Sequence, residues 1–415
     1  MLEDIKAVPE EEYAAYIDAK KKEIVEYHLQ KNSFYKNFFG KDKFSTWEEV
    51  PVMKKSDLQR PLEERFSKGF NTKNVYIGKT SGSSGHPFIF AKDRFCHALS
   101  WAEFNDRYHW HGIDLDRSVQ ARFYGIPLDK LGYFKERIKD RFGFRYRFPI
   151  FDLSDDKMEE FLQEFQKKKF NYINGYTSSI VLFAKFLKKK GIILKEICPN
   201  LKLCIVTSEM FFKEDKALLE KQFGVKVVNE YGASELGLLA FENKMGEWIL
   251  NSETMLVEVV DEKGMAVPNG REGRIVVTSL YNRAHPFIRY DIGDTGSLAE
   301  NSSLKKPILE HLVGRTNDVA ILPSGKVVPG LTFYYVTKSI IENEGLIKEF
   351  VVQQVEKGSF KILYVSEKAL SEEKREKILA AMAAYLEPNL KVEFEHKKIL
   401  NRTQRGKLKQ FEILA

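Results

Sequence analysis

The sequence predicts an α/β protein with a large N-terminal domain, built on a parallel βαβ sheet with an additional β-rich subdomain, and a small α+β C-terminal lid domain. Three observations predict it. From about residue 150, apolar strand-like runs alternate with helical segments of roughly 10 to 15 residues, as βαβ units require. Between 245 and 300 strands follow one another with turns between them. After about residue 317 a hairpin, two strands, a helix and a strand form a separate unit.

Length and composition favour more than one globular domain. A chain of 415 residues is too long for one small core, so we expect domains at 1–316 and 317–415. A hydrophobic content of 43% is typical of globular proteins. The 66 basic and 59 acidic residues give a net charge of +7, but the two signs alternate along the chain. We therefore interpret the surplus as a solvated surface and expect no nucleic-acid partner.

Other sequence features exclude several classes of protein. Cys96, Cys198 and Cys204 are too few and too scattered for a disulfide framework or a zinc site. The N-terminus has neither the basic region nor the apolar core of a secretory signal. No run approaches the ~18 apolar residues of a membrane span. We expect a cytoplasmic protein without a membrane span.

Several helices are predicted before residue 150. Apolar spacing predicts a helix over 10–40 that ends at Gly40, and 51–58 is expected to lead into another helix with Ser56 or Asp57 as its cap. A further helix is expected from Asp93 to His111.

The middle of the chain is predicted to alternate strands and helices. Helices are expected after Ser154, from Thr177 or Ser178 to Gly191, and before Gly224, with strands at 170–174, 201–207 and 225–229. Ligands bind outside the carboxyl ends of such strands, which draws attention to the loops 174–178, 208–210 and 230–235.

The remaining segments are predicted to be mainly strands. Those at 248–250, 255–260 and 274–279 are expected to form a second sheet that carries an exit loop at 289–296. The C-terminal unit is expected to contain a hairpin turned at 324–325, strands at 350–355, 360–365 and 391–395, a helix at 371–385 and a polar tail.

A Gly- and hydroxyl-rich loop lies between the strand-like runs 74–77 and 88–90, and consists of Thr80, Ser81, Gly82, Ser83, Ser84 and Gly85. Glycines let a ligand approach the backbone, and exposed N–H groups and hydroxyls together suit a polyphosphate. A flexible linker is the alternative for such a hexamer taken alone. It is not a Walker loop, because Lys73 stands where the leading glycine is required.

Four later residues have side chains that suit a nucleotide. A carboxylate after a parallel strand, such as Glu235, can hold Mg²⁺, and the neighbouring Tyr231 can cover an adenine ring. Asp294 can accept hydrogen bonds from a ribose diol, and Arg315 can donate to the same sugar. Each of the four, taken alone, also fits an ordinary turn residue or a surface ion pair.

The order of these motifs resembles a known family. The chain runs from Thr-Ser-Gly-Ser-Ser-Gly through Glu-Tyr-Gly-Ala-Ser-Glu, Tyr-Asp-Ile-Gly-Asp and Gly-Arg-Thr-Asn-Asp to Arg405-Gly-Lys407. This resembles the adenylate-forming superfamily of acyl-CoA synthetases, peptide-synthetase adenylation domains and luciferases. The compact length resembles its phenylacetate–CoA ligase branch. The phrases at 174–179, 205–209 and 314–318 resemble branch members encoded with capsule and exopolysaccharide genes. The resemblance covers roughly residues 20–415.

The resemblance implies a role for each motif. Thr80 to Gly85 would hold the ATP phosphates, and Glu235 would be catalytic as the Mg²⁺ ligand. Lys407 would be catalytic by reaching the carboxylate and α-phosphate during adenylation, with Lys409 as the alternative if the register shifts. Asn317 would be the hinge of the C-terminal domain. Adenine and ribose would be bound by Glu230, Tyr231, Gly232, Asp294 and Arg315.

Three positions depart from the family pattern. Many relatives have Lys directly after the loop's proline, where this chain has Phe88, so one phosphate contact is missing. The hinge is usually Asp or Lys and is Asn317 here, and Arg405 stands where many relatives have Ser or Glu. We expect these differences to affect the kinetics of domain rotation and to leave the catalytic set intact.

An acyl pocket is predicted from the strand ends, and its candidate residues are Tyr124, Asn174, Gly175, Tyr176, Thr177, Ala233 and Ser234. A polar and aromatic lining favours a small aryl or hydroxylated acid over a long fatty chain. The same aromatic residues also fit a structural role in the core.

The resemblance implies an ATP- and Mg²⁺-dependent ligase that forms an acyl-adenylate, releases pyrophosphate and passes the acyl group to CoA. An alternative acceptor is an amine or hydroxyl of a sugar precursor in capsule or exopolysaccharide synthesis. An alternative of another class is a non-catalytic nucleotide-binding or RNA-associated protein. Lys407 discriminates between these classes, because a binding protein does not need it.

Overall fold

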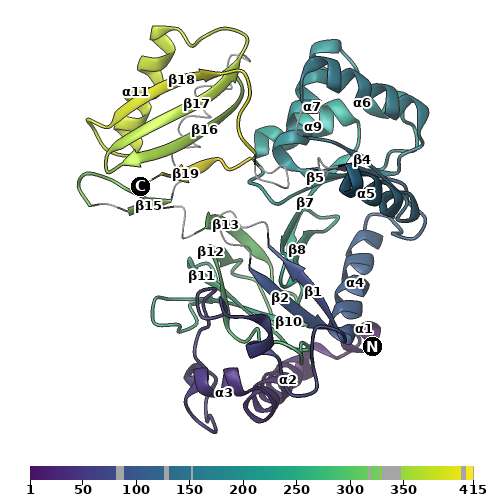
Figure 1. Cartoon of the computed structure of the whole chain (residues 1–415), viewed down its shortest axis with the longest axis vertical. Helices are drawn as coiled ribbons and strands as arrows, with labels where there is room; N and C mark the ends of the chain where they lie inside the picture. Colours follow the sequence, from purple (N-terminus) through teal and green to yellow (C-terminus); the bar gives the residue numbers. More distant parts are fainter. Residues whose placement is uncertain are drawn as a thin grey trace.

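The computed structural model describes residues 1–80, 88–125, 130–150, 153–315, 319–325, 327–329, 347–402 and 408–414. Figure 1 shows three lobes: one with α1–α3 and the strands β1, β2 and β10–β13, one with α5–α9 around a large sheet, and a C-terminal lobe with β16–β19 and α11. Across these ranges, no helix combines the length and the apolar character that crossing a bilayer would require.

The helices have the following bounds: α1 Leu2–Lys6, α2 Glu10–Lys31, α3 Ser33–Phe39, α4 Arg94–His109, α5 Lys130–Phe142, α6 Asp155–Lys167, α7 Thr177–Lys190, α8 Leu194–Ile197, α9 Lys213–Phe223 and α11 Glu372–Tyr385, with short 3-10 turns at Trp47–Glu49 and Leu62–Arg65. The strands of the first two lobes are β1 Val75–Lys79, β2 Ile89–Asp93, β3 Gln120–Phe123, β4 Arg145–Phe148, β5 Tyr172–Tyr176, β6 Leu203–Thr207, β7 Lys226–Ala233, β8 Gly237–Glu242, β9 Trp248–Leu250, β10 Met255–Val260, β11 Gly273–Ser279, β12 Tyr290–Leu298 and β13 Leu309–Arg315.

The largest sheet has seven strands in the order β4-β3-β5-β6-β7-β8-β9. The first five strands are parallel, and the pairings β7–β8 and β8–β9 are antiparallel, so the predicted α/β class is confirmed. The parallel part begins earlier than expected, because β3 and β4 precede residue 150. Every residue of β5 and β6 is buried, which is typical of parallel strands covered on both faces.

Helices cover both faces of this sheet. On one face α6, α7 and α9 enclose an aromatic core in which the ring of Phe148 lies 4.9 Å from those of Phe123 and Phe161. On the other face α4 contributes Tyr108, whose ring stacks 5.3 Å from that of Phe241 in β8. Truncating one such buried ring typically costs about 3–5 kcal/mol of folding free energy. The two layers therefore fix the strand ends in place.

A second, antiparallel sheet has the order β10-β11-β12-β13, and the β1–β2 hairpin shares its core. Two expectations about this part were wrong. β9 belongs to the large sheet, where it pairs with β8. The segment 289–296 was expected as an exit loop, but nearly all of it lies in β12, which pairs on both sides.

Three further local predictions need correction. The helix expected over 10–40 is two helices, because the side chain of Asn32 accepts a hydrogen bond from the backbone N–H of Tyr35 and caps α3. Residues 55–58 form a turn instead of a helix start, since Asp57 accepts from the N–H of Lys54 at 2.7 Å. Residues 230–233 lie in β7 and pair with β8, so they do not form a loop.

The C-terminal lobe contains β14 Val319–Ile321, β15 Val327–Pro329, β16 Ile347–Glu356, β17 Ser359–Ser366, β18 Lys391–Lys397 and β19 Phe411–Ile413. Its sheet has the order β18-β17-β16-β19 and packs on α11 through a core whose buried members all follow residue 319. The expected polar tail includes β19, which pairs in parallel with β16. The predicted boundary at 317 lies outside the described residues and stays a prediction.

Candidate nucleotide and acyl site

The Gly/Ser loop leaves from the tip of the β1–β2 hairpin. The N–H of Thr80 donates to the carbonyl of Phe88 at 2.9 Å, and the N–H of Phe88 donates to Thr80 Oγ1 at 3.0 Å. The predicted strand–loop–strand arrangement is therefore confirmed at its base. Ser81, Gly82, Ser83, Ser84 and Gly85 lie outside the described residues.

A close approach of ring and backbone stiffens this hairpin. The ring of Phe90 lies so near Gly78 that a Cβ at that position would overlap it. Phe90 is buried in the core shared with the second sheet. The hairpin that carries the loop is thus fixed to the sheet that carries Asp294.

Three of the predicted nucleotide residues lie together at the middle of β12. Tyr231 donates its hydroxyl proton to Asp294 Oδ2 at 2.6 Å. Asp294 lies directly opposite Arg315 in the β12–β13 register, which has a bulge beside it. These residues come from positions 84 apart in the sequence, and three separate strands bring them to one place.

Glu235 lies in the turn between β7 and β8, and its side chain is almost fully buried. Its Oε1 accepts a hydrogen bond from the hydroxyl of Tyr290 at 3.0 Å. The Nζ of Lys92 donates to the carbonyl of the next residue, Leu236, at 2.7 Å. Burial lowers the pKa of Lys92, while the charge of Glu235 is among those that raise it. A buried cation and a hydroxyl therefore hold this turn.

The surroundings of Glu235 fit one kind of magnesium site. Within the described part of the chain, no group of three or more His, Cys, Asp or Glu residues could hold a metal. Mg²⁺ in nucleotide sites is commonly held by one or two carboxylates together with phosphates and water. A single carboxylate oriented by Tyr290 fits that arrangement. It does not fit a site in which protein residues supply all the metal ligands.

Sequence reasoning missed two of these contacts. Lys92 is one of 66 basic residues and stands in no motif, so only its burial beside the Glu235 turn distinguishes it. Tyr290 belongs to the recognised Tyr-Asp-Ile-Gly-Asp motif, but the motif gave it no role. A role for Tyr290 could have been suggested by the alternation of side chains along a strand, which places every second residue on the same face.

Most of the predicted acyl residues lie at the carboxyl ends of β3 and β5, whereas Ala233 is the last residue of β7 and Ser234 follows it. The ring of Tyr124 is 4.6 Å from that of Tyr176, and Tyr176 is opposite Thr207 in the β5–β6 register. Thr207 is in turn opposite Glu230 in β7. Residues that are directly opposite in neighbouring strands point to the same face of the sheet, so the side chains of Tyr176, Thr207 and Glu230 form one row.

The structure gives Gly175 a steric role. A Cβ there would lie 2.5 Å from the Cβ and carbonyl oxygen of Phe123 in β3. Glycine thus allows the two strands to approach at the edge where the predicted acyl residues lie. Asn174, the preceding residue, points to the other face and is 4% exposed.

Glu230 and Tyr231 point to opposite faces of β7. The half-buried Glu230 accepts a hydrogen bond from the hydroxyl of Tyr108 at 2.7 Å, and Thr207 also donates to it. Burial raises the pKa of Glu230, and these hydrogen bonds and the charge of Arg122 oppose that rise. The structure thus places Glu230 with the predicted acyl residues and away from Asp294. Its predicted part in adenine or ribose binding stays a prediction.

A strained loop begins beside Thr177. Ser208 has φ 68°, a left-handed conformation that costs a residue with a side chain about 1 kcal/mol or more. The following Glu209 accepts a hydrogen bond from the N–H of Ser178 at 2.7 Å through Oε2. Thr177 and Ser178 were the expected caps of α7, but the helix starts at Thr177 and a carboxylate from β6's loop satisfies its first turn.

The C-terminal lobe contacts Glu209 and the first turn of α7. Glu209 Oε1 accepts from the N–H of Leu408 at 3.0 Å, so one carboxylate binds both lobes. Arg402 donates to Ser178 Oγ at 3.3 Å and forms a salt bridge with Glu349 of β16. In Figure 1 the segment that follows β18 extends toward the lobe that contains α7. Lys407 directly precedes Leu408, and both Lys407 and Asn317 lie outside the described residues.

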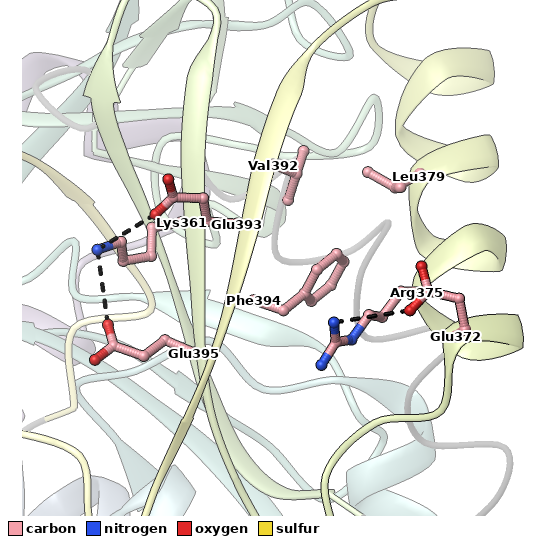
Figure 2. Close-up of a pocket in the computed structure, with 8 residues that line it drawn as sticks. All are labelled: Lys361, Glu372, Arg375, Leu379, Val392, Glu393, Phe394 and Glu395. Atoms are coloured by element: carbon pink, nitrogen blue, oxygen red, sulfur yellow. Dashed lines mark ion pairs between the residues drawn. The ribbon is translucent and has the colours of Figure 1, made fainter.

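A hollow of about 460 Å³ occurs elsewhere, between α11 and the sheet of the C-terminal lobe. Figure 2 shows its lining residues, which are Lys361, Glu372, Arg375, Leu379, Val392, Glu393, Phe394 and Glu395. Lys361 is paired with Glu393 at 3.5 Å, and Arg375 with Glu372 at 3.8 Å. Its cations are thus neutralised, and none of the predicted site residues line it.

Sequence comparison identifies relatives in two groups. The chain is 23% identical over 355 residues to protein CapK of Staphylococcus aureus, covering 79% of this chain and 74% of CapK. It is 27% identical over 177 residues to the phenylacetate-coenzyme A ligase of Thermus thermophilus, covering 40% of this chain and 38% of that enzyme. No protein-family model matches the sequence.

Structural comparison identifies the fold. The chain matches crystal structures of 2-hydroxyisobutyryl-CoA ligase at 17% identity. The TM-score is 0.74 for the postadenylation state, covering 97% of this chain and 90% of the ligase, and 0.61 for the thioesterification state. The resemblance predicted from the motifs is confirmed: the chain has the fold of the adenylate-forming enzymes, and its sequence relatives are CapK and the phenylacetate-coenzyme A ligases.

Proposed function

We propose that this protein is an ATP- and Mg²⁺-dependent ligase of the acid–thiol type. It activates a small aryl or hydroxylated carboxylic acid as an acyl-adenylate, releases pyrophosphate and transfers the acyl group, by default to CoA. Such an enzyme would work in the cytoplasm, where ATP and CoA are available.

The observation that best supports this proposal is the convergence of three residues at the middle of β12. Tyr231 donates to Asp294, and Asp294 is opposite Arg315. A carboxylate beside a cationic residue suits the two hydroxyls of a ribose, and a neighbouring aromatic ring suits an adenine. Sequence alone linked these three residues only through their order along the chain.

The reaction needs positioning and charge neutralisation more than covalent help from the protein. A carboxylate that attacks a phosphate brings two anions together, and an in-line displacement then depends on holding them in place. We propose that Lys407 supplies a positive charge between the acid and the α-phosphate. One such preorganised donor is typically worth roughly 3–4 kcal/mol. The Thr80–Gly85 loop would hold the leaving pyrophosphate.

Glu235 is the residue that would hold Mg²⁺. When bound, the metal would neutralise phosphate charge. The chain's own contribution is to keep the carboxylate in place through Tyr290 and through the contact of Lys92 with the neighbouring carbonyl.

A second acceptor is favoured by the relationship to CapK, whose name connects it with capsule formation. In this alternative an amine or hydroxyl of a sugar precursor receives the acyl group directly, and CoA is not used. The alternative of another class, a nucleotide-binding or RNA-associated protein without ligase chemistry, has no need of a lysine at position 407.

A screen of carboxylate-dependent ATP–pyrophosphate exchange tests the proposal. Aryl, hydroxy and amino acids are each assayed with the whole protein, and the acids that support exchange are then incubated with CoA or with amines. We expect exchange with at least one small polar or aryl acid and acyl transfer to CoA. Transfer only to amines or hydroxyls would favour the second acceptor. ATP binding without exchange for any acid would favour the non-catalytic alternative.

A further inference from the structure

The side chain of Asn174 has an unused hydrogen-bond donor at the predicted acyl site. Asn174 is 4% exposed and lies in β5, two residues before Tyr176 on the same face. Its Oδ1 accepts a hydrogen bond from Gln120 Nε2 at 3.4 Å. Its Nδ2 has no hydrogen-bond partner among the described residues. Buried polar groups are nearly always hydrogen-bonded, so this amide is expected to meet a ligand.

Arg122 is beside Asn174 and adds a second donor. The two are directly opposite in the β3–β5 register, so their side chains share a face. The guanidinium of Arg122 lies over the ring of Tyr124 at 4.3 Å. Its Nε is buried without a hydrogen-bond partner among the residues that the structure describes.

Glu230 supplies an acceptor on the same side. Glu230 lies one row of paired residues closer to the carboxyl ends of the strands than Asn174 does. Tyr108 and Thr207 donate hydrogen bonds to it. A carboxylate has about four acceptor positions, so two such bonds leave room for another donor. The face therefore combines two unused donors with an acceptor that has remaining capacity.

We propose that the acid activated by this protein carries a hydroxyl group, which accepts hydrogen bonds from Asn174 and Arg122 and donates one to Glu230. This inference depends on the proposed ligase function and specifies its substrate. A hydroxyl both donates and accepts, so it satisfies all three side chains at once. A second carboxylate would be repelled by Glu230 when that group is ionised, and an alkyl or plain aryl end would leave the donors unpaired.

Matched pairs of acids test the proposal through the same exchange assay. 4-Hydroxybenzoate is compared with benzoate, and 3-hydroxybutanoate with butanoate, while succinate represents a second carboxylate. We expect kcat/KM for the better hydroxy acid to exceed that of its deoxy partner by at least about 10-fold, since sites built to bind a hydroxyl strongly reject analogues without it. In Asn174→Leu that ratio should fall toward one, through loss of activity on the hydroxy acid alone.

Arg122→Met provides an independent variant if Asn174→Leu does not fold, and the same loss of discrimination is expected. The ratio for one enzyme preparation is unaffected by its active fraction. Equal use of the hydroxy and deoxy acids by the wild type, or preference for succinate, would overturn the inference and leave the ligase function standing. Exchange with none of the acids would overturn the ligase function and the inference with it.

Discussion

At the scale of single residues, Glu235 is the side chain whose surroundings most clearly suit its proposed role. It is almost fully buried and oriented by the hydroxyl of Tyr290. We predict that Glu235→Gln raises the Mg²⁺ concentration needed for half-maximal exchange by roughly 10-fold or more, because an amide is a poorer ligand for a hard cation. Tyr290→Phe removes only the orienting bond and should give a smaller shift. Identical magnesium titrations for Glu235→Gln and the wild type would contradict the metal role.

The buried His28 gives a stability prediction. His28 bonds to the carbonyl of Asn282 at 2.9 Å and to Ser67 Oγ at 3.2 Å, joining α2 to the core. Burial lowers its pKa from about 6.5 to about 4. Between these values the unfolded chain binds a proton that the folded chain does not, so stability present above pH 6.5 is lost as the pH falls toward 4. The contribution is on the order of 3 kcal/mol.

Urea unfolding at pH 7 and pH 5 measures this effect. His28→Gln should be less stable than the wild type at pH 7 and lose less stability on acidification. The comparison between the two proteins is needed because Glu103, whose burial raises its pKa to about 8, changes stability in the opposite sense. Parallel losses in both proteins would exclude His28 as the source.

The site residues that sequence predicted are those in short motifs with distinctive chemistry. Tyr231, Asp294 and Arg315 each stand in such a motif, and the fold brings them together. Lys92 and Arg122 could not be identified in this way. Their importance comes from burial and from neighbours far away in the sequence, and a single sequence does not show either.

At the scale of elements, Gly175 shows how closely two strands approach. A Cβ added at Gly175 would lie 2.5 Å from the Cβ and the carbonyl oxygen of Phe123. We predict that Gly175→Ala lowers stability by about 1–3 kcal/mol, because β3 and β5 must move apart. Thermal unfolding measures the loss. An unchanged melting temperature would mean that the strands can separate freely at this edge.

Element types were more predictable than element partners. Alternation of apolar strands and amphipathic helices identified β5, β6 and β7 and the helices between them. The same local patterns could not show that β9 pairs with β8, or that most of 289–296 lies in a strand between β11 and β13. Strand pairing depends on contacts between distant residues, whereas periodicity reports only which face of a segment is buried.

At the scale of the whole molecule, Glu209 connects the two parts that must cooperate. Its carboxylate accepts from Ser178 in the first turn of α7 and from Leu408, the residue after Lys407. We predict that Glu209→Ala reduces pyrophosphate exchange by roughly 10- to 100-fold, since misplacing a catalytic group by about 1 Å costs that much. Acyl transfer from a preformed adenylate should change little.

A matched control is Ser178→Ala, which removes the contact with Arg402 but keeps the backbone N–H that Glu209 binds. It should retain most of the exchange activity. Equal losses in both half-reactions of Glu209→Ala would indicate a general structural defect instead of a role in docking the C-terminal lobe.

The central claim is that the protein forms an acyl-adenylate, and carboxylate-dependent ATP–pyrophosphate exchange in Lys407→Ala tests it most directly. We expect this variant to lose exchange by about 10²–10³-fold, the effect of removing one preorganised charge, while ATP binding survives. Lys409→Ala, with the same change of charge two residues away, should behave like the wild type. Unchanged exchange in Lys407→Ala would mean that Lys407 takes no part in adenylation.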